Sequence, residues 1–136
     1  MTTGLEGIAA GASALAGQAA GLRAAVDSGK VVMTPEAAER VAKIYEDKAD
    51  DIRSRARDAQ RLVTNDAFGN CFIGRDLEKK FNEKVTGSST ASDAGLVPIL
   101  RKTEDILREM AQAYRDSAKE MQGADEEHAR NLSRNI

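Results

Sequence analysis

Apolar residues recur along three long stretches of the chain at alternating spacings of three and four positions. In the first stretch, residues 4–26, they are Leu5, Ile8, Ala12, Leu15, Ala19, Leu22 and Val26. This a/d repeat is typical of helices that pack against one another. Five glycines in the same stretch each cost roughly 1 kcal/mol relative to alanine in a helix interior. We therefore expect a helix that is stable only against another surface.

Residues 1–33 are predicted to form this Ala/Gly-rich N-terminal helix or arm. Its apolar side chains Leu5, Ile8, Leu15 and Leu22 would either cover the rest of the chain as a third helix or grip a partner. The glycine pairs Gly7/Gly11 and Gly17/Gly21 would allow two helix backbones to approach closely. Equally, they can reflect a tolerant, frayed N-terminus.

A second helix is predicted from Pro35 to about Val63. Thr34 is placed to cap it, Pro35 suits the first helical position, and Glu36 lies at the positive end of the helix dipole. Its apolar stripe consists of Ala38, Ala42, Tyr45, Ala49, Ile52, Ala56, Ala59 and Val63. Charged residues fill the other positions, so one face should be buried and the other solvated.

The last helix is predicted from Gly95 or Pro98 to about Asn131, with Ile99, Ile106, Met110 and Ala113 on one seam and Leu100, Leu107 and Tyr114 beside it. Two long stripes joined by a compact connection indicate an antiparallel hairpin. The predicted fold is thus all-α, a long helical hairpin (34–136) with an additional N-terminal helix. We expect Tyr45, Ile52, Ile106, Leu107, Met110 and Tyr114 to form the hairpin core, with whatever they leave uncovered as an interface.

The connection, residues 64–95, has a different character because it carries all three phenylalanines. Phe68, Gly69, Phe72 and Gly74 suit a bend in which glycine takes positive φ and an aromatic ring closes the open end of the hairpin. A plain turn with a local cluster is the simpler interpretation. If either ring is buried, truncation to alanine should cost about 3–5 kcal/mol. A short helix is expected at Asp76–Val85, and the last helix either begins there and breaks at 86–93 or starts afresh afterwards.

Composition narrows the functional classes. The chain has 20 basic and 22 acidic residues, so no nucleic-acid-binding character is evident. Residues 7–22 are too short and weakly apolar for stable membrane insertion, and no signal-peptide pattern opens the chain. We expect a cytoplasmic protein, or one secreted without a cleavable signal.

Candidate chemistry is sparse, and we predict neither enzymatic activity nor a metal or other cofactor. His128 is the single histidine, and with Asp125 it supplies at most half of a helical di-metal site. Cys71 has no histidine nearby in sequence. It could be reactive if exposed beside Arg75, but a small buried cysteine is the commoner state and the one we expect. Arg53, Arg57 and Arg61 recur at four-residue spacing, and we interpret this row as a solvated helix face.

Three segments carry a family resemblance: Val63–Gly69, Ile73–Leu77 and Met110–Asp116. Over Thr34–Leu132 the chain resembles the Trp-x-Gly helical-hairpin superfamily of actinobacterial type VII (ESX-like) secretion. It is most similar to that superfamily's secretion-associated proteins, in which Phe-Gly stands near the bend. The resemblance implies a hairpin that pairs with another helical hairpin or with itself as a dimer.

The chain departs from the family pattern in two places. It has no Trp, so Phe72-Ile73-Gly74 or Phe68-Gly69 takes that place. The family's export signal is a Tyr followed four residues later by an acid, yet Ala118 follows Tyr114 at that spacing. We therefore expect a non-catalytic secretion-associated substrate or partner; the alternative is a cytosolic helical adaptor or chaperone-like protein.

Overall fold

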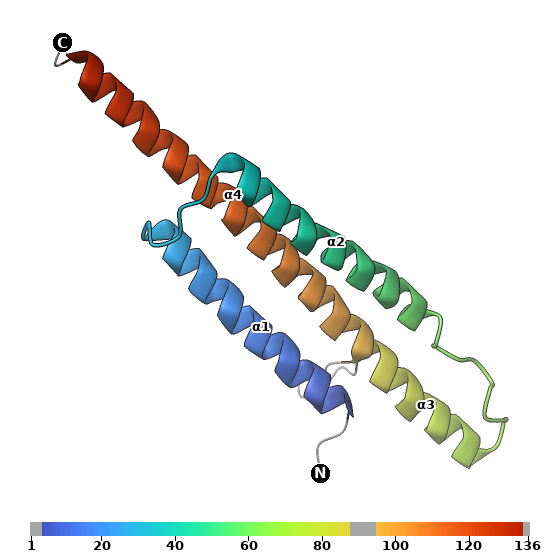
Figure 1. Cartoon of the computed structure of the whole chain (residues 1–136). Helices are drawn as coiled ribbons and strands as arrows, with labels where there is room; N and C mark the ends of the chain where they lie inside the picture. The colour runs from blue at the N-terminus through green and yellow to red at the C-terminus, as the bar shows by residue number, and fades with distance from the viewer. Residues whose placement is uncertain (1–3, 88–94, 135–136) are drawn as a thin grey trace.

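The computed structural model describes residues 4–87 and 95–134, and it confirms the all-α hairpin expected from the sequence (Figure 1). Its helices are α1 (Gly4–Asp27), α2 (Pro35–Gln60), α3 (Phe72–Thr86) and α4 (Leu96–Arg134). The first arm of the hairpin is α2, and α3 followed by α4 forms the returning arm.

Helix α4 is the surface on which the others assemble. Both α2, which runs antiparallel to it, and α1 pack against α4, whereas no comparable packing joins α1 to α2 in the described residues (Figure 1). Small side chains fill the α2–α4 contact. The fully buried alanines of α2 are Ala38, Ala42, Ala49 and Ala56, and Ala111 of α4 is buried as well. Side chains of this size let the two helix axes approach closely along their whole common length.

Helix α2 begins where the sequence predicts and ends earlier. The Thr34 hydroxyl oxygen accepts the Ala37 N–H at 3.3 Å, which caps the helix. The helix ends at Gln60 rather than Val63 because the backbone of Thr64 is hydrogen-bonded to a side chain of α3. Its N–H donates to Asn82 Oδ1 and its carbonyl accepts from Asn82 Nδ2, both at 3.0 Å. A side chain of α3 thus takes the place of the next helical turn.

Helix α3 begins four residues before the predicted Asp76. Cys71 caps it, its Sγ accepting the Gly74 N–H at 3.3 Å. The returning arm then breaks and resumes. A Cβ added to Gly95 would lie 2.1 Å from the Gly87 nitrogen, so the end of α3 and the start of α4 meet. Of the two alternatives for the last helix, the structure shows the interrupted one: a first helix ends at Thr86 and a second begins at Leu96.

Helix α1 is the additional N-terminal helix that the sequence predicts, and it covers one side of α4. Ala12, Ala19 and Val26 are buried, and Leu15 and Leu22 pack around Ala19. The glycines point the other way: no atom lies within 4 Å of a Cβ built on Gly7, Gly11, Gly17 or Gly21. The expectation that these glycines mediate a close helix contact is therefore wrong within this chain, because the alanine face makes the contact instead.

Candidate interaction surfaces

Four of the six predicted seam residues, Tyr45, Ile106, Met110 and Tyr114, lie in one region of the fold, where α1, α2 and α4 meet. Ile106 and Met110 of α4 are buried with Ala19 of α1, and Tyr45 of α2 packs against this cluster. The Tyr45 and Tyr114 rings stack with centroids 5.5 Å apart and an interplanar angle of 23°. Burial, and secondarily Tyr45, raises the pKa of the Tyr114 hydroxyl above its ordinary value. This hydroxyl therefore stays neutral at physiological pH.

Part of the seam remains accessible. Tyr45, Ile52, Leu107 and Tyr114 are only half-buried, although they lie beside the fully buried alanines of the hairpin. Leu107 and Tyr114 are seven residues apart, so they occupy the same position around α4. We call these four side chains the seam face. In the arm, Leu5, Leu15 and Leu22 are half-buried, whereas Ile8 is 45% exposed.

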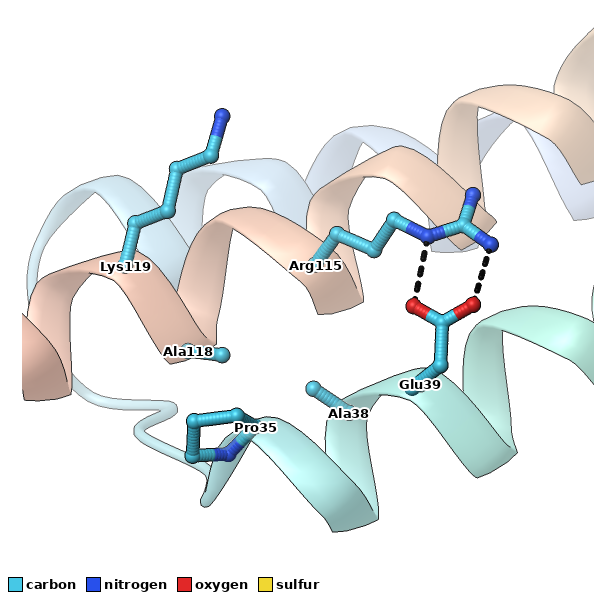
Figure 2. Close-up of a pocket in the computed structure, with 6 residues that line it drawn as sticks. All are labelled: Pro35, Ala38, Glu39, Arg115, Ala118 and Lys119. Atoms are coloured by element: carbon cyan, nitrogen blue, oxygen red, sulfur yellow. Dashed lines mark hydrogen bonds and ion pairs between the residues drawn. The ribbon is translucent and has the colours of Figure 1, made fainter.

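Arg115 links α4 to the start of α2. It donates two hydrogen bonds to Glu39, at 2.8 and 3.0 Å (Figure 2), and a third to Glu46. These bonds lower the pKa of both carboxyl groups and raise that of the guanidinium. Because all three side chains remain partly in solvent, the cluster fixes the register of the helices more than it adds stability.

The same cluster borders a shallow pocket lined by Pro35, Ala38, Ala118 and Lys119 (Figure 2). The arginine at its rim is already satisfied by two carboxylates, and the remaining lining is mostly small and apolar. Lys119 pairs with Asp116 at 3.5 Å. The pocket therefore offers no free nucleophile or general base. Sequence reasoning missed this cluster because each of its members looks like an ordinary solvated charge.

The bend carries the largest apolar exposure in the fold. Of the eleven large hydrophobic residues that are exposed in the described part of the chain, seven fall between positions 62 and 81. We call them the tip surface: Leu62, Val63, Phe68, Phe72, Ile73, Leu77 and Phe81. Phe72 is 88% exposed and Ile73 69%. The expectation that an aromatic ring closes the hairpin is thus wrong for Phe72, which extends into solvent at the first position of α3.

The two glycines of the connection shape this bend. Gly69 has φ of +85°, which a residue with a side chain rarely adopts. A Cβ on Gly74 would lie 2.2 Å from the Phe68 carbonyl oxygen, so the backbone passes too closely for any other residue. Phe68 meets Phe81 edge-on with centroids 6.0 Å apart. Ile73, Leu77 and Phe81 follow at four-residue spacing, which places them in one row along α3.

Charge is unevenly distributed along the rod. Residues 52–87 and 95–103, which contain the bend, carry ten basic and five acidic residues. The other described residues carry ten basic and sixteen acidic residues. The near-neutral total therefore conceals a positive bend end and a negative remainder, in which most of the acidic excess lies in the middle of the rod, at residues 44–51 and 104–116. Arg53, Arg57 and Arg61 belong to the positive end and are exposed, as expected.

Residues that could support chemistry are dispersed. Cys71 is exposed, so the expectation of a buried cysteine is wrong; its place in an uncovered turn is the reason. His128 and Asp125 are exposed in the C-terminal part of α4. Among the described residues, no three His, Cys, Asp or Glu side chains gather as a metal site would require. In the same part of the chain, no helix combines the length and apolar character needed to cross a bilayer.

Comparison with known proteins adds no relative: no family model, no curated protein and no solved structure matches the chain.

Proposed function

We propose that this chain is a non-catalytic interaction protein that receives a partner helix on its seam face. The observation that carries the proposal is the layer formed by α1, α4 and α2. The outer two helices pack on α4 without comparable packing on each other in the described residues. Tyr45, Ile52, Leu107 and Tyr114 are half-buried in this layer. A helix laid on them would complete a four-helix arrangement.

The partner expected for this face is another helical hairpin or a second copy of the chain. The resemblance to type VII secretion-associated proteins favours this partner, since pairing between hairpins is what it implies. The chain carries no Tyr followed by an acid four residues later at Tyr45 or Tyr114. We therefore propose that it is exported, if at all, as the companion of a chain that bears the signal.

The alternative function is that of a cytosolic helical adaptor or chaperone-like protein with no role in secretion. The unmatched export signal favours this second candidate. Both candidate functions use the seam face in the same way. They differ in whether the complex is exported or stays in the cytosol. A secretion assay in the native host separates them: absence of the chain from the medium, while a known substrate appears there, would leave the adaptor.

Site-specific photo-crosslinking tests the seam face itself. A photoreactive residue replaces Leu107 in one strain and Gln112 in a control strain, since Gln112 is an exposed residue of the same helix. Five residues separate the two positions, which turns them about 140° apart around α4. We expect a single cross-linked species of defined mass from position 107 and none from 112. Equal products from both positions, or none from either, would reject the seam face as an interface.

A further inference from the structure

The bend end of the rod has an unusual construction that the seam face does not use. Ala59 near the end of α2 packs with Val85 near the end of α3. The part of α3 before this contact therefore extends beyond α2, accompanied only by the connecting segment 61–71 (Figure 1). Phe72 and Ile73 lie at the outermost end of this projection. Nothing in the described chain covers them.

The exposed apolar groups point in several directions. Phe72 and Leu77 are five residues apart on α3, which places them about 140° from each other around the helix. Together the seven side chains of the tip surface expose on the order of 700 Å², spread around a helix end and a loop. A standard protein interface buries about 800 Å² per partner on one continuous face. A fluid surface that closes around the end matches this shape better than a rigid protein face.

Basic residues follow the apolar groups along the same helix. Lys80 and Lys84 border the row of Ile73, Leu77 and Phe81, and Lys79 lies on the opposite side. They stand about 10–18 Å further along α3 than Phe72, at 1.5 Å per residue. The acids among them are Asp76, which pairs with Lys80 at 3.2 Å, together with Glu78 and Glu83. With Arg75, α3 carries one basic residue in excess, and residues 52–61 at the end of α2 add four arginines against one aspartate. The order along the rod is thus apolar at the extremity and positive behind it.

From this order we infer that the tip surface docks end-on and reversibly on an anionic lipid surface. Phe72 and Ile73 enter the boundary between headgroups and acyl chains, and the lysines of α3 meet the lipid phosphates. Peripheral attachment of useful strength needs two such signals together, an apolar one and a basic one. The rest of the described rod carries sixteen acidic and ten basic residues, so a negative surface repels its sides, which favours an end-on approach.

Vesicle co-sedimentation of the full chain tests the inference. The probes are vesicles of phosphatidylcholine mixed with phosphatidylglycerol, and vesicles of phosphatidylcholine alone. The test variant is F72Q/I73Q, and the matched control is L132Q. Leu132 is 65% exposed but lies at the opposite end of the rod, so its substitution changes an exposed apolar side chain outside the tip surface. None of the three residues is buried, so the variants should fold normally.

We expect binding to the mixed vesicles that weakens at least about tenfold in F72Q/I73Q and is unchanged in L132Q. Raising the salt from ~0.05 M to ~0.5 M should weaken it as well, because the charge contribution is screened. Absence of binding to the mixed vesicles at low salt would overturn the inference, as would equal loss in both variants. Light scattering that shows a dimer of the unsubstituted chain and a monomer of F72Q/I73Q would also overturn it, since the tip surface would then be a dimer interface.

Discussion

Replacing Gly17 and Gly21 with alanine should stabilise the folded chain. Both glycines are exposed in the interior of α1, and no atom lies within 4 Å of a Cβ built on either. An added methyl therefore meets no clash and gains no contact. What changes is the helix propensity, which favours alanine by roughly 1 kcal/mol per position. The double variant should gain about 2 kcal/mol, equivalent to a rise in melting temperature of about 4–8 °C.

The assay is urea and thermal unfolding followed by circular dichroism, combined with hydrogen exchange of the α1 amides. Exchange is needed because α1 can open before the rest of the fold, in which case the gain appears as slower exchange in that helix. Unchanged or reduced stability by both measurements would refute the reasoning. It would mean that the glycine face of α1 is packed against another molecule in solution.

Gly74→Ala is the matched control, because the same substitution should have the opposite sign. Here the new Cβ would lie 2.2 Å from the Phe68 carbonyl oxygen and 2.7 Å from that of Gly69. These are backbone atoms, so the bend itself must shift. We expect a loss of about 1–3 kcal/mol, the usual range for an overpacked site. A neutral result would show that the bend is looser than its geometry indicates.

Three further predictions concern the core, the tip surface and acid stability. Met110→Ala should lower the free energy of unfolding by about 2–5 kcal/mol in urea titrations, since Met110 is 6% exposed in the α1–α4 contact. Phe72→Ala should change it by less than about 0.5 kcal/mol, because the ring is 88% exposed; a loss of several kcal/mol would mean that the ring is covered. Acid should destabilise the fold through Glu39, Glu46 and Asp116, whose pKa values are lowered by Arg115 and Arg23. Their contribution is complete above pH 4.5, the ordinary value of the two glutamates, and is lost as the pH falls through the lower folded-state values. Urea midpoints at about pH 6 and about pH 3 should therefore differ less in Arg115→Met than in the unsubstituted chain.

Features controlled by residues near in sequence were predictable. Thr34 and Pro35 determine the start of α2 through local capping chemistry, and the structure places the helix start there. The repeats of alanine, leucine and isoleucine predicted which faces of α2 and α4 meet. Burial of Ile106 and Met110 follows from the same repeat.

Features controlled by distant residues were not predictable. The end of α2 depends on Asn82, eighteen residues away from Thr64. The start of α3 depends on a cysteine cap, which is not among the residues that usually fill this position. One interpretation of the connection has Phe68 or Phe72 closing the open end of the hairpin, yet the Phe72 ring is 88% exposed. Its exposure results from the length of α3 relative to α2, which no periodicity records.

The meeting of Gly87 and Gly95 has a consequence for how freely this protein can be altered. The chain leaves the returning arm and re-enters it at almost the same point in space. The entropy of closing a loop rises only with the logarithm of its length once its ends are fixed together. Sequence placed between these two glycines should therefore be replaceable or extendable at little thermodynamic expense. A fluorescent domain or an affinity tag could be grafted there, leaving both the tip surface and the seam face at their native positions.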